Sequence, residues 1–356
     1  MDFALSGDQR ELKAAARHYL DRSYPPTRIA ELSDGAGVDG QAWPELVRQG
    51  WLDPELTTVE LALLAEQGGR VLHPVPWLVT VALAVPAYQA AGVALPGPAT
   101  LADGSTGCRA ERRSAGWSVT GRVPGVVQAG LATELLVAAA TEDGTALFAV
   151  APAAPGVTVT PRQGVDPLRV QAELELADAP GRLLLDPPAT GPVLAEAGQR
   201  WRLLLACEAV GVADRVLELA VEYARIRTQF DRPIGSYQAV AHQLADSYAE
   251  LELARSLAYR AACALADQPD QHDQHAGTAE AIACAVSAGV RAAVRGCEVA
   301  MQAAGGIGVT WEYPLHRWYR RALFLRAVTG DPLATIAGQL LDSPASDRVE
   351  GALASA

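Results

Sequence analysis

The stretch ARIRTQFDRPIGSYQAVAHQLADSYAELELARS, residues 224–256, decides how this chain is interpreted. Two segments with helical spacing of apolar residues flank a short break. The break holds a cation, two amides and an aromatic ring: Arg227, Gln229, Gln238 and Phe230. A cation at a helix C-terminus interacts favourably with the helix dipole, but this accounts only for Arg227. The amides and the ring add little stability around a Pro-Gly bend, so the break predicts contact with a ligand.

A second cluster, MQAAGGIG at residues 301–308, closes a later helical segment. Glycine at a helix end is ordinary capping, and this alternative stays open. Here, however, Gln302 precedes Gly305 and Gly306, and glycines let backbone N–H groups approach an anionic or extended ligand closely. The two clusters together suit the pyrophosphate and sugar of a dinucleotide. Neither cluster is a GxGxxG after a strand, so the sequence argues against a Rossmann site.

The patterns on either side of these clusters predict a mainly α protein with a central β domain. Ser6 and Gln9 form a capping pattern before an N-terminal helical region. Short runs separated by Pro and Gly follow, and they indicate strands in a compact sheet or barrel. Helical spacing then returns, with long helices expected at residues 193–227, 235–267 and 278–304. The predicted domains are a helical domain (1–94), a β domain (95–192) and a helical bundle (193–356).

The composition and charge of the chain disfavour several classes of binding partner. The 356 residues carry a net charge of -12, which disfavours a nucleic-acid partner. Five scattered cysteines without CxxC spacing predict neither a disulfide framework nor a metal site. The sequence shows neither a signal-peptide pattern nor an uninterrupted apolar run of membrane-spanning length, so we expect a cytoplasmic protein without a membrane partner. Helices this long cannot hide every face in one small domain, so we expect self-association.

The two clusters resemble signatures of the acyl-CoA dehydrogenase family. Residues 227–246, RTQFDRPIGSYQAVAHQLAD, are similar to R-x-x-F-G-x-x-I-x-x-F-Q-x-x-x-x-x-L-A-D, and residues 301–308 are similar to Q-x-x-G-G-x-G. The order of helical and strand regions also fits, so the resemblance covers nearly the whole chain. It implies the family's fold: an N-terminal helical domain, a middle β-barrel or sheet domain and a C-terminal four-helix bundle.

The resemblance also implies a cofactor, FAD. In that family the two segments hold the adenosine-diphosphate half of an FAD that is bound mainly by a neighbouring subunit. By motif position the implied cofactor-binding residues are Arg227, Gln229, Phe230, Gln238, Gln302, Gly305 and Gly306. One departure is Asp231, which stands where the family pattern has glycine.

The family's catalytic base is missing from both of its usual positions. The reaction needs a carboxylate that removes the α proton of an acyl thioester. In the segment that is similar to the family's Y-E-G-T motif, Thr329 replaces the glutamate, and Trp201 occupies the second position, before Arg202. No catalytic residue is therefore assigned. Asp331 and Glu208 remain alternatives as displaced bases.

The predicted β domain also departs from the family. The family's W-I-T strand contacts the flavin ring, and its counterpart at residues 121–129 has Gly125 and Val127 instead of Trp and Thr. Residues 101–109 are too short to be the family's Y-x-x-T-E-P-x-x-G-S-D loop. The resemblance therefore implies that the chain has lost its own isoalloxazine site.

One further segment resembles a subgroup of the family. Residues 310–317, TWEYPLHR, are similar to its T-W-E-x-x-x-H. In that subgroup, which oxidises bulky acyl-CoA substrates such as steroid side chains, two dissimilar subunits form an α2β2 tetramer and only one carries the base. For His316 we expect a polar contact at a helix start.

The leading hypothesis is thus a non-catalytic acyl-CoA dehydrogenase-like subunit that completes the FAD site of a homologous partner. Two alternatives stay open. One is a self-sufficient homo-oligomer that uses Asp331 or Glu208 as the base. The other is a flavin-free structural protein on the same fold.

Overall fold

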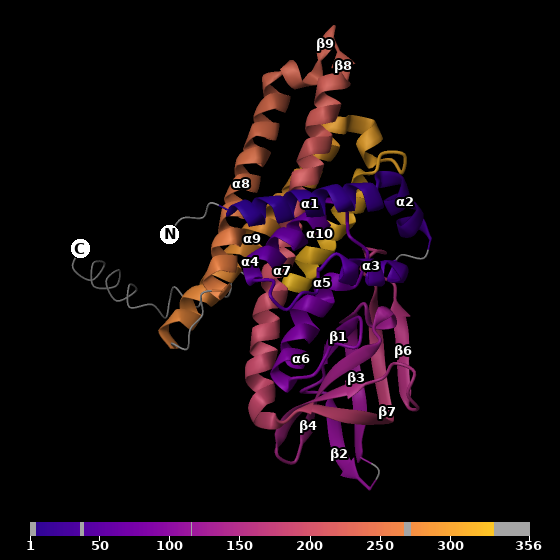
Figure 1. Cartoon of the computed structure of the whole chain (residues 1–356). Coiled ribbons are helices and arrows are strands. Elements are labelled where there is room, and N and C mark those ends of the chain that lie inside the picture. The colour runs from indigo at the N-terminus through magenta and orange to yellow at the C-terminus, as the bar shows by residue number, and fades with distance from the viewer. Residues whose placement is uncertain (1–4, 36–38, 115, 267–271, 331–356) are drawn as a thin grey trace, which may run out of the picture. The chain divides into compact units, whose positions relative to one another are not determined.

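The computed structural model describes residues 5–35, 39–114, 116–266 and 272–330. The chain divides into two compact units. The helical unit comprises Met1–Pro26, Thr57–Leu72 and Arg202–Ala356, and the strand unit comprises Thr27–Leu56 and His73–Trp201. The described elements are mostly helices with a central β region (Figure 1), which confirms the predicted fold class. The predicted division into three domains stays a prediction.

The N-terminal helices of the helical unit begin where side chains cap them. Helix α1 (Gly7–Ser23) starts after Ser6, whose hydroxyl accepts a hydrogen bond from the Gln9 backbone while the Gln9 side chain accepts one from the Ser6 backbone. The predicted capping box is confirmed. Helix α4 (Thr58–Arg70) begins with the same box, made by Thr57 and Glu60. Helix α4 packs between α1 and helix α8 (Gln238–Ala266).

The three predicted long helices are present. They are α7 (Pro187–Ile226), α8 and α9 (His272–Ala304), followed by the 3-10 turn η5 (Gly305–Val309) and helix α10 (Leu315–Thr329). Helix α9 packs along both α8 and α10. By length and composition, the segment Gly277–Val309 passes as a membrane span, but 67% of its apolar window is buried within the protein, as in the core helix of a bundle.

Helices α4 and α7 cross in the helical unit at two glycines. A Cβ atom on Gly69 would overlap the carbonyl oxygen of Glu208, and one on Gly211 would overlap that of Glu66. The crossing brings both glutamates into the interior. Glu66 accepts hydrogen bonds from Lys13 Nζ at 3.0 Å and Arg255 Nε at 3.2 Å, so its buried charge is compensated.

The strand unit begins with short helical elements that precede and cover strands. They are α2 (Pro26–Asp34), η1 (Gly40–Ala42), α3 (Trp43–Arg48), α5 (Trp77–Val79), the π-helix η2 (Thr80–Ala84) and α6 (Val85–Ala91). The strands are β1 (Ala99–Asp103), β2 (Cys108–Arg113), β3 (Gly116–Val127), β4 (Glu134–Thr141), β5 (Gly144–Val150), β6 (Val157–Arg162) and β7 (Gln171–Leu185). The 3-10 turn η3 (Ala129–Leu131) lies between β3 and β4.

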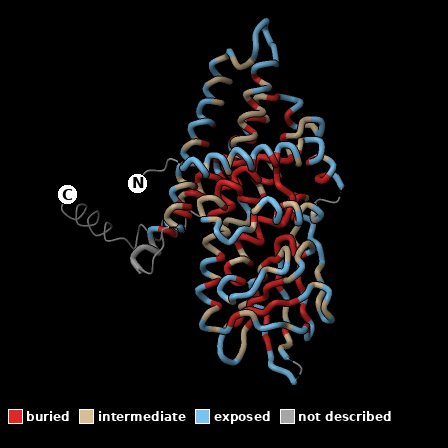
Figure 2. Tube along the Cα trace, in the orientation of Figure 1, coloured by how far each residue is buried: buried red, intermediate tan, exposed pale blue. Residues whose placement is uncertain are grey.

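Strands β1 to β7 form one seven-stranded sheet that closes on itself. Their order is β1-β4-β2-β3-β7-β5, with β5 also pairing with β4 and β6 pairing with β7. The strand runs predicted near residues 117, 134, 146 and 156 are confirmed in β3, β4, β5 and β6. Alternate side chains, including Val119, Leu135, Phe148 and Leu174, fill a buried core (Figure 2).

Candidate functional site

The first predicted cluster forms a hairpin between α7 and α8. Strands β8 (Thr228–Gln229) and β9 (Arg232–Pro233) pair, and the 3-10 turn η4 (Ile234–Ser236) leads into α8 (Figure 1). The turn residues Phe230 and Asp231 have φ values of 51° and 64°. A two-residue turn with both φ values positive matches the strand twist. Aspartate tolerates this region better than most side chains, so Asp231 can replace the family's glycine without changing the turn.

Local contacts hold this hairpin in one shape. The Ile234 amide donates to the Arg227 carbonyl at 2.8 Å, and the Tyr237 hydroxyl donates to the Gln229 carbonyl at 3.0 Å. The Arg232 guanidinium lies 4.0 Å from the centre of the Tyr237 ring. The backbone around Gln229 is therefore fixed before any ligand binds.

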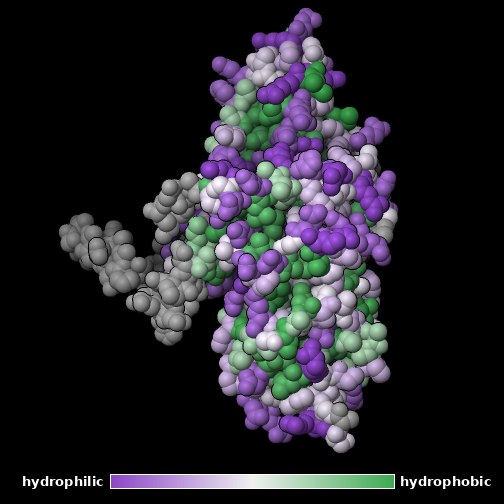
Figure 3. Space-filling view, in the orientation of Figure 1, coloured by the Kyte–Doolittle hydropathy of each residue, from purple (hydrophilic) through white to green (hydrophobic). Residues whose placement is uncertain are grey.

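The functional side chains of the hairpin point into solvent. Phe230 is 87% exposed, and Arg227, Gln229 and Gln238 are exposed as well. In Figure 3 the tip of this hairpin is covered mainly by hydrophilic residues. Within the described ranges, no carboxylate pairs with Arg227. A guanidinium in this state is available for charge-assisted hydrogen bonds to a phosphate.

The second predicted cluster separates into ligand-facing and packing glycines. Helix α9 ends at Ala304, and Gly305 follows with a φ of 65°, so the capping role is real. A Cβ atom on Gly305 or Gly306 would meet no other atom within 4 Å, so both glycines leave open space beside the chain. A Cβ on Gly308 would lie 2.6 Å from the Met301 carbonyl oxygen, so Gly308 is required for packing.

A tyrosine joins the loop after the second cluster to the helix that precedes the first cluster. The Tyr313 ring lies 5.8 Å from the Tyr223 ring, and the Tyr313 hydroxyl donates to the Leu219 carbonyl at 3.5 Å. Leu219 and Tyr223 lie in the last turns of α7, just before Arg227. The loop after η5 therefore lies beside the end of α7. Residues 227–238 and 302–306 are called the handle segments below.

The donor set of the handle segments fits the adenosine-diphosphate half of FAD. An arginine without a carboxylate partner suits phosphate oxygens, and the open space at Gly305 and Gly306 lets a ligand approach the chain closely. The exposed amides of Gln229, Gln238 and Gln302 suit ribose and phosphate groups, and the Phe230 ring offers a flat apolar face. A ligand with this chemistry would restore hydrogen bonds that the free protein makes only to water.

The predicted base positions contain no carboxylate. Thr329 ends α10, and its hydroxyl donates to the Leu325 carbonyl at 2.9 Å. Glu208 is 1% exposed and forms an ion pair with Arg321 at 2.5 Å, so it is an interhelix contact inside the helical unit. The alternative base Asp331 lies outside the described residues.

Three positions singled out in the sequence meet in one pocket of the strand unit. Gly125 and Val127 from β3 and Trp201 from α7 line a pocket of about 340 Å³. The bulge of β3 between Val123 and Val126, where Gly125 has a φ of 71°, opens the strand toward it. The other lining residues are Leu83, Leu101, Ala102, Asp103, Val123, Pro124, Val126, Leu194 and Gly198.

This pocket does not suit a flavin ring. The ring has a polar edge of N–H and C=O groups that need hydrogen-bond partners when buried. No side chain lining the pocket carries a hydroxyl or an amide, and Val127 stands where the family's threonine would be. The FAD half that fits this chain is therefore the adenosine-diphosphate half.

Asp103 is the one ionisable side chain lining this pocket, and the sequence analysis missed it. Its Oδ1 accepts a hydrogen bond from the Ser105 amide at 3.2 Å. Asp103 lies in residues 101–109, which the sequence analysis treated only as a shortened loop. The run Ala99–Asp103 forms β1, and a carboxylate at a strand end is the signal that could have marked it.

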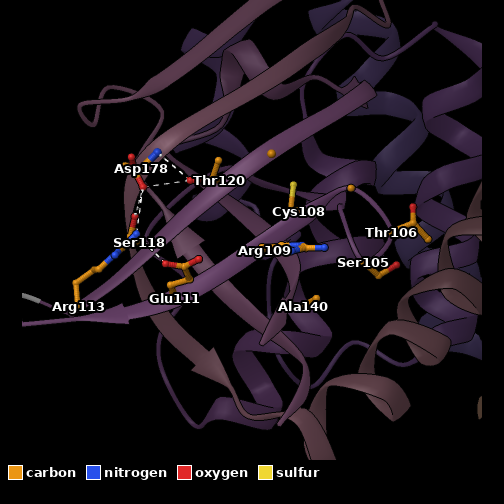
Figure 4. A pocket seen from close by; sticks show the side chains of 12 residues that line it. Ser105, Thr106, Cys108, Arg109, Glu111, Arg113, Ser118, Thr120, Ala140 and Asp178 are labelled. Carbon is orange, nitrogen blue, oxygen red and sulfur yellow. Dashed lines mark hydrogen bonds and ion pairs between the residues drawn. The ribbon is translucent and has the colours of Figure 1, made fainter. Parts of the chain in front are cut away.

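A larger hollow of about 680 Å³ lies on the polar face of the sheet. Figure 4 shows Ser118 Oγ donating to Asp178, and Arg113 pairing with Glu111. Its charges of both signs largely satisfy one another, and it contains no predicted site residue. Among the described residues, no group of three His, Cys, Asp or Glu side chains could hold a metal ion.

The segment 310–317, singled out in the sequence, makes local contacts. His316 Nδ1 lies 3.0 Å from the Tyr313 carbonyl oxygen in the first turn of α10, which is the helix-start contact expected for it. Its ring also packs edge-on against Trp311, with centroids 4.6 Å apart.

Comparisons with known proteins agree with the geometry. Residues 192–332 match the acyl-CoA dehydrogenase C-terminal domain. The acyl-CoA dehydrogenase FadE27 of Mycobacterium tuberculosis is 31% identical over 382 residues, with 97% of this chain and 100% of the relative covered.

Two solved structures extend this similarity. A chain of the ChsE4–ChsE5 complex from Mycobacterium tuberculosis superposes with a TM-score of 0.83 at 27% identity, covering 97% of this chain and 100% of that one. A chain of the Tcur3481–Tcur3483 steroid ACAD gives 0.80 at 28% identity, covering 94% and 98%. The chain belongs to the acyl-CoA dehydrogenase family.

Proposed function

We propose that this chain is the subunit of a heteromeric acyl-CoA dehydrogenase that completes the FAD site of a homologous partner and supplies no catalytic base. Arg227 neutralises charge on the pyrophosphate, while Gln229, Gln238 and Gln302 hydrogen-bond the cofactor. Gly305 and Gly306 let the backbone approach the cofactor closely. When bound, FAD would supply the acceptor for the hydride that leaves the β carbon of the acyl thioester.

One contrast supports this proposal above all. In the handle segments Arg227, Gln229, Gln238 and Gln302 are exposed and no described carboxylate pairs with Arg227, whereas the base positions hold Thr329, whose hydroxyl is bonded within its own helix, and Trp201. A threonine cannot act as a general base at neutral pH. A chain that keeps the cofactor-binding surface without a base is useful beside a partner that has one.

The partner is inferred to be a second chain of the same fold, in an α2β2 assembly. Two relatives of this chain are named as complexes of two different polypeptides, ChsE4–ChsE5 and Tcur3481–Tcur3483. The second is named as a steroid ACAD, which supports a bulky acyl-CoA as the substrate of the assembly. We further propose that the assembly is cytoplasmic.

The test is co-expression with a neighbouring dehydrogenase-like gene, followed by measurement of bound flavin by absorbance. We expect the complex to bind FAD and oxidise acyl-CoA, and the isolated chain to do neither. Arg227→Ala removes charged hydrogen bonds that contribute about 1.5–3 kcal/mol, so FAD affinity of the complex should fall about 10- to 100-fold. Arg225→Ala, an exposed arginine in the last turn of the same helix, is the matched control.

Two outcomes would contradict the proposal. Strong FAD binding with acyl-CoA oxidation by the isolated chain would favour a self-sufficient enzyme. Unchanged FAD content in every assembly that carries Arg227→Ala would favour a flavin-free structural protein.

A further inference from the structure

The pocket of the strand unit contains open space that the packing of the surrounding residues does not explain. Gly198 lies inside α7, where glycine costs about 1 kcal/mol relative to alanine. A Cβ atom on Gly198 would meet no other atom within 4 Å, and its φ is not positive. Neither crowding nor backbone conformation therefore demands glycine here. Its missing side chain leaves the pocket open at the cost of helix stability.

A second glycine of the pocket, Gly125 of β3, also leaves open space, although here the backbone conformation requires glycine. A Cβ atom on Gly125 would have only Gln171 Nε2 near it, at 4.0 Å. The left-handed φ of Gly125 excludes most side chains, so this wall stays bare. The two glycines face the pocket from β3 and from α7.

Half-buried apolar side chains line the space between these glycines. They are Leu83, Leu101, Leu194 and Trp201, from three different elements: η2, β1 and α7. Leu101 and Leu194 also pack on the buried cluster that contains Leu136 and Leu147. Leu83 is presented by a π-helix, a rare element that often marks functional sites. An apolar ligand would remove their remaining surface from water, at about 25 cal/mol per Å².

Asp103 determines which polar group a ligand of this pocket can carry. One of its carboxylate oxygens is engaged by the Ser105 amide, and among the described residues no cation pairs with the group. Asp103 is exposed at the end of β1, and beside the apolar side chains of the pocket its carboxylate accepts hydrogen bonds and repels anions. A hydroxyl on an otherwise apolar molecule satisfies it, whereas a phosphate or a carboxylate on the ligand would not.

We propose that this pocket binds a neutral, apolar ring compound through a hydroxyl group that donates to Asp103. Its volume of about 340 Å³ is near the lower end for ligand pockets, which suits two or three fused rings rather than a dinucleotide. The site is separate from the handle segments, and the proposal does not depend on the proposed function.

The test compares three probes with one ring system. Naphthalen-2-ylmethanol carries the hydroxyl, 2-ethylnaphthalene lacks it, and 2-naphthoate replaces it with an anion. Binding to the full-length chain is measured by isothermal titration calorimetry or equilibrium dialysis. A hydrogen bond to a charged group predicts that the alcohol binds about tenfold or more tightly than the hydrocarbon, and that the naphthoate binds weakest.

Two variants locate the binding. Gly198→Leu fills the space and should reduce the affinity of the alcohol more than tenfold without lowering the melting temperature. Gly191→Leu is the control, because a Cβ there also meets no atom within 4 Å but Gly191 does not line the pocket. Asp103→Asn should remove most of the alcohol's advantage over the hydrocarbon and allow the naphthoate to bind.

The proposal is overturned if no probe binds, if the alcohol and the hydrocarbon bind equally, or if Gly198→Leu keeps full affinity. Should Gly198→Leu fail to fold, the order of the three probes on the wild-type chain and on Asp103→Asn decides the question. Loss of FAD binding to a complex that carries Arg227→Ala would not change this result, so the two proposals fail independently.

Discussion

The handle segments and the strand-unit pocket both contain glycines beside open space, but they differ in the charge and polarity of their side chains. Each exposes glycines over which a side chain would find open space: Gly305 and Gly306 in one, Gly125 and Gly198 in the other. Around the first pair lie an unpaired cation and amides, and around the second lie apolar side chains and one carboxylate. Open backbone therefore makes room for a ligand, and the neighbouring charge decides which ligand enters.

The two units also differ in how far their residues depart from the family pattern. The helical unit keeps the residues that suit a phosphate, and it even keeps the turn where Asp231 replaces glycine. The pocket of the strand unit offers no hydroxyl or amide side chain to a flavin ring. The side chains of the two units therefore suit different ligands.

The largest expected effect concerns Glu208 and tests whether this buried carboxylate of the helical unit acts as the catalytic base. Glu208→Ala breaks a fully buried ion pair and leaves Arg321 charged in the interior, which should lower the free energy of unfolding by about 3–5 kcal/mol. Replacing both partners by leucine should restore most of this stability, because a buried pair is often dispensable when it is removed whole. Urea denaturation measures both changes.

Turnover gives the control for this prediction. The double variant, in complex with the partner, should oxidise acyl-CoA at the wild-type rate per bound flavin. If stability is restored while turnover falls a hundredfold or more, Glu208 is a displaced base, and the contrast between the two regions is wrong.

Most of the helical unit could be predicted because its signals are local. Capping at Ser6, the three long helices and the break at Arg227 all follow from spacing within one segment. The sheet was only partly foreseen. Strand β7 carries Asp178 and Pro180 within its length, and β1 and β2 lie in Gly-rich sequence, so their strand character comes from pairing with distant partners.

The candidate site was likewise predictable where its signals are local and not where it depends on distant contacts. The handle residues could be assigned from two motifs, and the sequence already showed that Thr329 and Trp201 are not bases. The convergence of Val127, Trp201 and Asp103 on one pocket could not be predicted, because it depends on a bulge in β3 and on contacts between distant segments. The pairing of Glu208 with Arg321 likewise joins residues 113 positions apart.

A smaller effect tests the open backbone of the handle segments. Gly306→Leu adds a side chain where no atom lies within 4 Å and no positive φ is strained, so stability should hardly change. The new side chain covers the neighbouring N–H groups, and FAD affinity of the complex should fall about tenfold, or about 1.4 kcal/mol. Gly191→Leu, equally unhindered but distant in sequence, should leave FAD affinity unchanged. Equal losses in both variants would mean that the handle glycines serve only helix capping.

The smallest effect concerns Glu218, which anchors the part of α7 that leads to Arg227. Burial alone would raise the pKa of Glu218, but hydrogen bonds and charge from Arg215 and Arg70 outweigh it and hold the pKa below its ordinary value. A folded-state pKa below the unfolded one means that the group stabilises the protein above about pH 4.3 and that this stabilisation disappears as the pH falls through the lowered value.

Because the Glu218 side chain is 35% exposed, solvent screening limits the effect to less than about 1 kcal/mol. Glu218→Gln should therefore be slightly less stable than wild type at pH 7 and approach wild-type stability as the pH falls below the lowered pKa, which urea denaturation across this pH range measures. Glu222→Gln removes an exposed carboxylate one turn later and should show no such convergence; a Glu218→Gln deficit that grows as the pH falls would mean that the pairs with Arg70 and Arg215 do not hold this helix.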